Sequence, residues 1–412
     1  MDLYFERHDG QAVTIDDFVA AMEDANNVDL SQFKRWYSQA GTPQIKAKAV
    51  IDSGTLTLTL SQFCKATPGQ DEKLPFYIPI KLAIFSPAGQ PYDIQQELII
   101  LNEEKHTYEF HDIEDGAVVS LLRDFSAPVS LSFNQKDDDL RLLIEFETDG
   151  FARFEAMYKL QKRVLHELLK QAERGEQLQF NSDMAELYSK LLQQSDMDMA
   201  LKAELLQPLS FEEIVSELKQ IDVAQVMSVR DFYLDNLAEH CREEMLSHYL
   251  SLAASAADSG ARKLKNVLLS YLSRDSKNIK LLKQQFEQAN NMTDEIAALS
   301  LIVNQGAEVA DDAITAFYNK WSSQELVLDK WFTVQASADT PEVIQAVTSL
   351  MVHSDFHLSN PNKVRALISG FAMGNPRYFH TEAGYQILAD VIGKRDKVNP
   401  QTAARLVTPL TR

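Results

Sequence analysis

The hydrophobic period changes twice along this 412-residue chain, and these changes limit what it can fold into. Residues 1–40 have the period of a helix, apolar and polar residues alternate in residues 41–148, and the helical period returns in residues 149–412. Alternation is typical of strands with one buried face, whereas a period of about 3.6 residues is typical of amphipathic helices. The sequence therefore predicts a multidomain β + α protein: a short helical segment, a small antiparallel β-sandwich and a large all-α superhelical domain.

The middle region predicts a sandwich because its short strands follow one another without an intervening helix. Residues 45–51 and 56–60 alternate on either side of Asp52-Ser53-Gly54, which has the composition of a hairpin turn. Seven or eight short strands with turn signals every ten residues or so are typical of a small sandwich. The further strands are expected at residues 76–85, 97–101, 107–110, 118–122, 129–133 and 140–147.

The last region predicts consecutive helices that are separated by short breaks. Such a series is typical of a bundle or of a curved stack of helix pairs. No repeat of fixed period is evident, so the pattern is not that of a tetratricopeptide or HEAT array. The breaks are expected at Gly175, Pro208, Asp222, Gly260, Asp275 and Gly306.

The total charge restricts the partners of the chain. A net charge of −20 argues against a nucleic acid or an anionic membrane as partner. No apolar run approaches the roughly 20 residues that a membrane-spanning helix needs. The two cysteines, Cys64 and Cys241, lie far apart in the sequence and predict no disulfide framework. These features predict a cytoplasmic protein in a reducing compartment.

The first 40 residues predict helices with little to pack on. Thr14 is a favourable N-cap, with the acidic Asp17 three residues later. Phe18, Phe33 and Trp36 lie on apolar faces that so short a segment cannot bury by itself. We therefore expect these faces to be exposed, as part of a helical layer whose remainder is absent. The abrupt start and the end within a helix also suggest that the chain is cut at both ends.

Three Asn-Pro pairs near the C-terminus form the constellation that most resembles a ligand site. Asn is a favoured N-cap and Pro a favoured first helical residue, so Asn360, Asn375 and Asn399 each predict a helix start. Arg365 and Arg405 follow two of these starts by five and six residues, and helical side chains lean toward the N-terminus. Free backbone N–H groups together with an arginine suit a carboxylate. The alternative is that both arginines pair with Asp or Glu of a neighbouring helix.

Catalytic and metal-binding motifs do not emerge from the sequence. The nearest match to the zinc motif H-E-x-x-H begins at His166 but has Lys170 in the last position. His353 and His357 have the spacing of a two-histidine metal site, with Asp355 between them, yet no third ligand is evident. The sequence also lacks the glycine-rich loops that hold phosphates. We therefore expect no catalytic residue, no metal and no cofactor in this chain.

Several segments resemble the bacterial aminopeptidase N family of zinc metallopeptidases, the gluzincin aminopeptidases. The resemblance covers nearly the whole chain in the order of the family and is poor between residues 173 and 276. Phe154 also stands where the family often has Trp. The segments are residues 2–10 (DLYFERHDG), 33–43 (FKRWYSQAGTP), 123–129 (RDFSAPV), 286–294 (FEQANNMTD), 329–332 (DKWF) and 359–362 (SNPN).

This resemblance implies that the chain is the C-terminal part of a zinc enzyme that removes N-terminal residues from peptides. Residues 1–40 would be the helical end of the catalytic domain, residues 41–148 a β-sandwich, and residues 149–412 a helical domain that caps the active-site chamber. The zinc ligands and the general base would lie in the preceding part of the polypeptide, so that this chain alone is inactive. Arg365, Gln401 and Arg405 match family residues that face the chamber near the peptide C-terminus.

Two other functions remain open at this point. In the first alternative, the chain is a free-standing helical scaffold without enzymatic role. In the second, it is a metal enzyme built on His353 and His357. Exposed apolar faces at Phe18, Phe33 and Trp36 would favour the fragment, because an autonomous scaffold would have covered them. The partners that we expect are the missing catalytic domain and peptide substrates.

Overall fold

The computed structural model describes residues 1–255, 258–397 and 399–411. The chain separates into two compact units, Met1–Leu160 and Gln161–Arg412. The predicted arrangement of a small β-sandwich followed by a large all-helical region is confirmed. The finer division at residues 40/41 and 148/149 stays a prediction.

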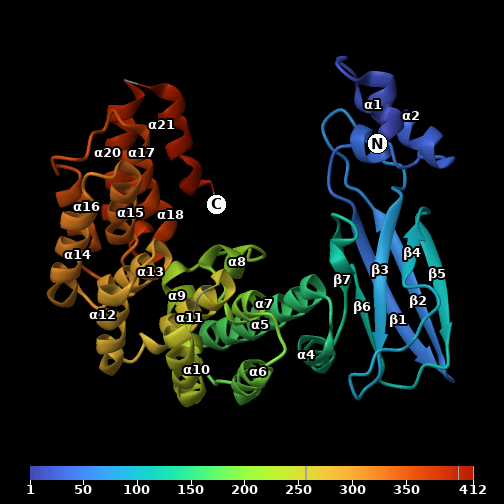
Figure 1. Ribbon diagram of the computed structural model, residues 1–412, viewed down its shortest axis with the longest axis horizontal. Coiled ribbons are helices and arrows are strands. Elements are labelled where there is room, and N and C mark those ends of the chain that lie inside the picture. Colours follow the sequence, from blue (N-terminus) through green and yellow to red (C-terminus); the bar gives the residue numbers. More distant parts are fainter. Residues whose placement is uncertain (256–257, 398, 412) are drawn as a thin grey trace. The chain divides into compact units, whose positions relative to one another are not determined.

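The first unit contains two facing sheets (Figure 1). One sheet has the order β5-β2-β1-β7 and the other β4-β3-β6. All strand pairs are antiparallel except β1 and β7, which are parallel. The strands are β1 (Gln44–Asp52), β2 (Thr55–Phe63), β3 (Ile78–Phe85), β4 (Leu98–Leu101), β5 (Lys105–His111), β6 (Val118–Leu121) and β7 (Ser130–Phe133).

The apolar faces of both sheets form the core of the sandwich, as the alternation predicts. Leu56, Leu58 and Leu60 of β2 are fully buried against the apolar side chains of β3. The predicted hairpin joins β1 to β2 through Ser53 and Gly54, which both have positive φ, at 52° and 79°. Two consecutive residues with positive φ are the requirement of a type I′ turn, whose twist matches that of the strands.

The predicted strand at residues 140–147 is wrong, because this segment is the helix α4 (Asp137–Phe146). Its buried residues are Leu140, Leu143 and Ile144, which have helical spacing. A short apolar run fits both periods, and the three aspartates that open the segment are a helix start signal. The carboxylate of Asp139 accepts a hydrogen bond from the Lys136 N–H at 2.7 Å and so fixes the first turn.

The N-terminal helices are less exposed than expected at the three predicted positions. Trp36 of α3 (Arg35–Ser38) packs on Phe76 of the sandwich, with ring centroids 4.8 Å apart, and its indole N–H donates to a backbone carbonyl. Phe18 of α2 (Ile15–Asn26) and Phe33 are half-buried. The expectation of exposed faces there is therefore wrong. The exposed apolar side chains of residues 1–40 are instead Met1, Phe5, Ile15, Val28 and Tyr37, and α1 (Asp2–His8) buries no residue.

Within its described residues the second unit has helices joined by short connections and no strand, and α5 (Gly150–Glu173) leads into it. It also contains a π-helical turn at Arg365–Ser369, between α17 and α18, and a 3₁₀ turn at Thr408–Leu410 (η4). The remaining helices are α6 (Ser182–Gln193), α7 (Met199–Leu206), α8 (Phe211–Val215), α9 (Val223–His240), α10 (Arg242–Ser255), α11 (Ser259–Leu272), α12 (Ile279–Gln288), α13 (Met292–Val303), α14 (Ala307–Trp321), α15 (Glu325–Ala336), α16 (Val343–Leu350), α17 (Pro361–Val364), α18 (Gly370–Gly374), α19 (Pro376–Phe379), α20 (Glu382–Asp396) and α21 (Pro400–Leu406).

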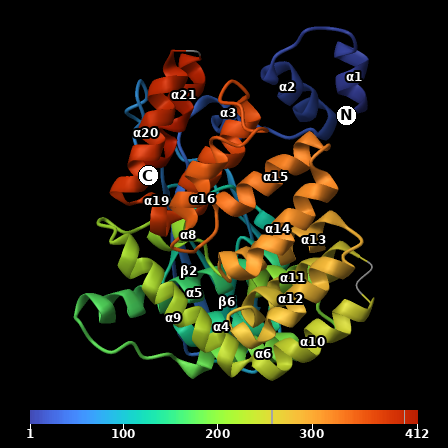
Figure 2. The same ribbon diagram turned by 90° about the vertical axis from the view of Figure 1, so that its left-hand side faces the viewer.

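Neighbouring helices of the second unit pack in pairs, and each pair contacts the next. Figure 2 shows α13, α14 and α15 side by side, and α10 also packs on α11 and α12 on α13. The predicted break at Gly260 is displaced, because this glycine lies in the first turn of α11, where a Cβ would come within 2.9 Å of the Ala200 nitrogen. None of the helices within the described residues combines the length and apolar character that crossing a bilayer requires.

Candidate functional site

The three Asn-Pro pairs begin helices, as predicted. The side-chain oxygen of Asn360 accepts from the N–H of residue 362 at 2.9 Å at the start of α17. Asn375 caps α19 in the same way at 3.2 Å, and Asn399 caps α21 at 3.0 Å. Proline follows each cap as the first helical residue, where its missing N–H costs no hydrogen bond.

Arg365 leans back toward the start of its helix, as the direction of helical side chains predicts. It is the first residue of the π-helical turn and is exposed. Its Nη2 donates to the side-chain oxygen of Asn362 at 3.1 Å. Within the part of the chain that the structure describes, no carboxylate lies in ion-pair distance of Arg365. The guanidinium therefore retains free donors at the surface.

Gln401 and Arg405 lie one turn apart on α21, and both are exposed. Neither side chain has a hydrogen bond or an ion pair with residues 1–255, 258–397 or 399–411. The alternative in which Arg365 and Arg405 pair with carboxylates of a neighbouring helix is thus not what the described residues show. The role of these three residues in binding a ligand stays a prediction.

Arg395, which the sequence did not single out, connects the two helix starts that lead to these arginines. Its side chain is only 2% exposed, and its Nη1 donates to the carbonyls of Leu358 at 2.8 Å and Ser359 at 3.3 Å, directly before Asn360. The backbone carbonyl of Arg395 accepts from the N–H of Asn399 at 2.8 Å. One buried residue of α20 therefore fixes the start of α17 and the start of α21 relative to each other.

The start of α20 depends on a glycine. Thr381 caps this helix by accepting from the N–H of Gly384 at 3.2 Å. A Cβ at Gly384 would lie only 2.3 Å from the carbonyl oxygen of Phe379, so no other residue fits without a shift of the backbone. This close approach makes the sharp turn from α19 to α20 and places His380 between the two helices.

The two histidines considered for a metal do not share a helical face. His353 and His357 lie in the connection between α16 and α17, which is not helical, so the i, i+4 spacing has no geometric meaning there. The ring of His353 packs against Trp331 at 5.3 Å and Tyr318 at 5.5 Å, and its Nδ1 accepts from the N–H of Asp355 at 3.2 Å. Residues 1–255, 258–397 and 399–411 contain no group of three or more potential metal ligands.

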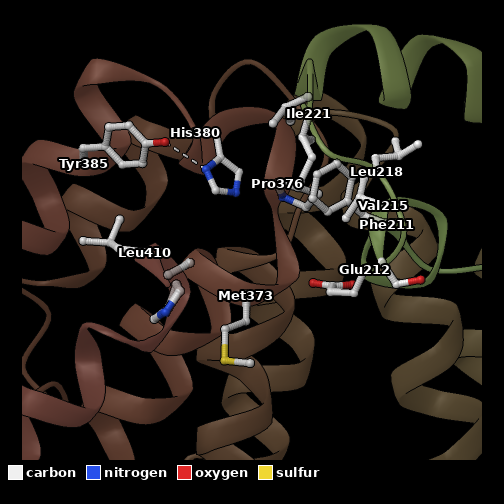
Figure 3. A pocket seen from close by; sticks show the side chains of 14 residues that line it. Phe211, Glu212, Val215, Leu218, Ile221, Met373, Pro376, His380, Tyr385 and Leu410 are labelled. Carbon is white, nitrogen blue, oxygen red and sulfur yellow. Dashed lines mark hydrogen bonds between the residues drawn. The ribbon is translucent and has the colours of Figure 1, made fainter. Parts of the chain in front are cut away.

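A pocket of about 590 Å³ opens in the second unit between two segments that are distant in the sequence (Figure 3). One wall is formed by α8 and the segment that follows it. The other wall is formed by α18, α19, the start of α20 and η4. Most of the lining is apolar, and it includes Phe211, Val215, Ile221, Met373, Pro376 and Leu410. Segment 173–276, which holds the first wall, is where the family resemblance is poor.

A ring contact across the pocket and ion pairs of Arg377 beside it connect the surrounding helices. The rings of Phe211 and His380 lie 6.3 Å apart across the opening. The Nη2 of Arg377 in α19 pairs with Asp231 of α9, and its Nε donates to Asp339 at 2.8 Å. Because of these contacts, the pocket is already shaped in the protein without a bound ligand.

The polar groups of the pocket are few and well placed. Nδ1 of His380 lies 2.9 Å from the hydroxyl of Tyr385 (Figure 3). Burial lowers the pKa of the His380 imidazole below its ordinary value of 6.5, and the charge of Glu212 opposes this shift. The imidazole is therefore neutral at pH 7. Ser210 and Glu213 form a capping box that begins α8 and so presents Glu212 in its first turn.

Comparisons with known protein families cover almost the entire chain. A family described as "Domain of unknown function (DUF3458_C) ARM repeats" matches residues 137–412. A second, described as "Domain of unknown function (DUF3458) Ig-like fold", matches residues 41–134.

Relatives with known names are aminopeptidases. The chain is 36% identical over 429 residues to aminopeptidase N of Escherichia coli (strain K12), covering 100% of this chain and 49% of that protein. It is 34% identical to aminopeptidase N of Haemophilus influenzae, with the same coverage. A crystal structure of Legionella pneumophila aminopeptidase A in complex with aspartic acid is 30% identical, with a TM-score of 0.84, covering 98% of this chain and 48% of that one. The chain thus spans about half the length of the curated relatives it matches.

Proposed function

This chain belongs to the DUF3458_C family, and from that premise we propose that it is the non-catalytic C-terminal portion of an aminopeptidase N. The observation that carries the proposal is the match of the whole chain to about half of each aminopeptidase. The parent would be a cytoplasmic, zinc-dependent enzyme of the alanyl type that removes N-terminal residues from peptides. Its zinc would be held by the part of the polypeptide that precedes this chain.

Within the parent, residues 1–40 would complete the catalytic domain, residues 41–148 would form the linking sandwich, and residues 149–412 would cap the active-site chamber. The cap would restrict entry to peptides. Exposed apolar side chains in residues 1–40 support this proposal, since Phe5 and Ile15 are 54% and 52% exposed on short helices. Large exposed apolar side chains on short helices are what we expect of a surface that another part of the protein covers.

Arg365, Gln401 and Arg405 would hold the C-terminal carboxylate of a short peptide in this chamber. Both arginines are exposed and have no carboxylate partner among the described residues. An arginine fork binds a carboxylate through two parallel hydrogen bonds, and the Gln401 amide supplies a further donor. Arg395 supports the arrangement because it fixes both helix starts from inside the protein.

The first test is metal content by elemental analysis of the 412-residue chain, together with hydrolysis of an alanyl amide at high protein concentration. We expect no stoichiometric zinc and no turnover, and turnover should appear when the preceding catalytic domain is supplied. Stoichiometric zinc with turnover in the chain alone would contradict the proposal. Failure of the supplied catalytic domain to bind the chain would favour a free-standing scaffold.

The second test concerns the carboxylate. In the parent enzyme, Arg365→Ala and Arg405→Ala should each raise KM for dipeptides by about tenfold, from the loss of a charge-assisted hydrogen bond, and change KM for longer peptides less. The matched control is Arg242→Ala, because Arg242 is an exposed arginine of α10 that forms an ion pair with Asp275 at 3.4 Å. Equal effects on all peptide lengths would argue against the carboxylate role.

A further inference from the structure

The pocket between α8 and α18–α20 has no part in the proposed function, although it has the features of a binding site. Its volume of about 590 Å³ lies within the range of ~300–1,000 Å³ that is typical of small-molecule sites. Three of the large apolar side chains that the protein leaves exposed converge on it. Ile221, Met373 and Leu410 are 40%, 45% and 49% exposed, and an apolar ligand would remove this surface from water.

The charge inside the pocket determines which ligands fit. The carboxylate of Glu212 points into the pocket (Figure 3), and within the described part of the chain it has neither an ion pair nor a hydrogen-bond partner. Nδ1 of His380 is engaged with Tyr385, which leaves Nε2 facing the opening. In the tautomer that donates from Nδ1 to the Tyr385 oxygen, Nε2 is an acceptor. Both free polar groups of the pocket then suit a ligand that donates hydrogen bonds.

Other ligand classes fit less well. A carboxylate or phosphate would be repelled by Glu212 at short range. A neutral apolar compound would remove water from the same carboxylate without replacing its hydrogen bonds, which costs free energy. A metal ion has only Glu212 and His380 as potential ligands in the lining, fewer than a stable site needs.

We propose that this pocket binds a small organic cation that has an apolar, preferably aromatic, body and one primary ammonium group. The ammonium group pairs with Glu212 and donates a second hydrogen bond to Nε2 of His380. The apolar body lies against Phe211 and Leu410, and the sulfur of Met373 makes a favourable contact with an aromatic ring. Because the walls are already joined by Arg377 and Asp231, binding needs no large rearrangement.

The test is isothermal titration calorimetry of the 412-residue chain with 2-phenylethylamine as the probe. 3-Phenylpropionate, which has nearly the same size and the opposite charge, is the matched ligand. We expect 1:1 binding of the amine and binding of the carboxylate that is weaker by about tenfold or more, because it meets the Glu212 charge. Absence of amine binding, or equal binding of both compounds, would overturn the proposal.

Substitutions in the pocket test whether the amine binds there. Glu212→Gln should weaken amine binding by about threefold to fivefold, the effect of one partly solvated ion pair, and leave the circular dichroism spectrum unchanged. Glu186→Gln on α6 is the control, because Glu186 is also exposed and the substitution changes the net charge by the same amount. Leu410→Asp should abolish the apolar contact without disturbing a helix core, since Leu410 is half exposed. Equal affinities of the Glu212 and Glu186 variants would refute this site.

Discussion

The core of the β-sandwich and the core of the helical unit differ in what they bury. The sandwich core is a single cluster of apolar side chains, in which Leu56, Leu58 and Leu60 are fully buried. The helical unit also buries charged side chains, and several of them reach segments far away in the sequence. Lys265 pairs with Asp294 at 2.6 Å, and Arg395 donates to the carbonyls before Asn360.

This difference explains which features can be read from the sequence. Apolar alternation is a local property, so it predicts a sandwich from the order of residues alone. A buried ion pair depends on two segments whose proximity is set only by the fold. Its contribution also differs in kind, because breaking such a pair leaves one charge buried without its partner. The comparison can be tested by removing one element of each core.

The largest effect is expected from Lys265→Met in the helical unit. Burial acts to raise the pKa of Asp294, but the hydrogen bonds and charge of Lys265, with help from Asn291 and Asn266, hold it below its ordinary value of 3.8. A carboxyl group with a lowered pKa stabilises the fold above that value and loses this contribution as the pH falls below it. Removal of Lys265 should therefore cost about 3–5 kcal/mol at pH 7. Urea unfolding measures this loss.

The double variant Lys265→Met with Asp294→Leu provides the control. Removal of both charges eliminates the unpaired carboxylate, so most of the lost stability should return. If the single and double variants are equally unstable, packing rather than charge holds this part of the helical unit. The distinction between the two cores would then disappear.

The second largest loss of stability is expected from Leu58→Ala in the sandwich core. Leu58 is fully buried, so its truncation should leave a cavity and reduce the free energy of unfolding by about 3 kcal/mol. The cost should be the same at pH 5 and pH 9, because the fully buried side chains of the cluster have no titratable group. Burial raises the pKa of Tyr108, which lies opposite Leu58 on β5, above its ordinary value of 10. Thr57→Ala, on the other face of β2, should change the stability by less than about 1 kcal/mol. A pH-dependent cost of Leu58→Ala would contradict a purely apolar core.

Particular residues show which parts of the fold can be predicted from the sequence. The hairpin at Ser53-Gly54 and the three Asn caps were predicted because a turn or a cap needs specific residues at adjacent positions. The helix α4 was taken for a strand because its apolar residues fit both periods over so short a run. The packing of Trp36 on Phe76 was missed, since a contact across 40 residues leaves no local pattern.

The candidate sites are harder to predict than the fold, because distant segments of the sequence form them. Arg365 and Arg405 were found because they follow caps closely in the sequence. Arg395 was not, because a Lys-Arg pair in the last turn of a helix is usually at the surface. The pocket has one wall near Phe211 and the other near His380, and neither segment alone has a motif.

The third effect is a loss of stability at alkaline pH, which we expect in the helical unit and not in the sandwich. Burial raises the pKa of Tyr188 to about 12, and it raises the pKa of Tyr233 and Tyr271 well above 10. A raised pKa leaves stability intact below pH 10 and removes it as the pH rises toward the folded value. From Tyr188 alone the helical unit should lose about 2–3 kcal/mol by pH 12.

Tyrosinate absorbance measures this effect. We expect the four buried tyrosines of the helical unit, Tyr188, Tyr233, Tyr249 and Tyr271, to ionise only when this unit unfolds. Tyr188→Phe should shift this unfolding to higher pH, whereas Tyr108→Phe in the sandwich should not. Reversible ionisation of these buried tyrosines in the folded protein would show that water reaches them.

The smallest effect compares two helix caps, Asn399 before α21 and Thr14 before α2. Each accepts a hydrogen bond from a backbone N–H, so replacement by Ala should cost about 1 kcal/mol in either case. The two caps differ in what they hold. The N–H of Asn399 donates to the carbonyl of Arg395, and Asn399 begins the helix that carries Gln401 and Arg405. The N–H of Thr14 donates to the side chain of Asp17 within its own capping box, far from these residues in the sequence. In the parent enzyme, Asn399→Ala should therefore raise KM for dipeptides by about threefold to fivefold, because a frayed α21 presents Arg405 for less of the time. Thr14→Ala should leave KM unchanged. Equal KM values for both variants would mean that α21 does not contribute to the peptide site, and Arg365 would then act alone.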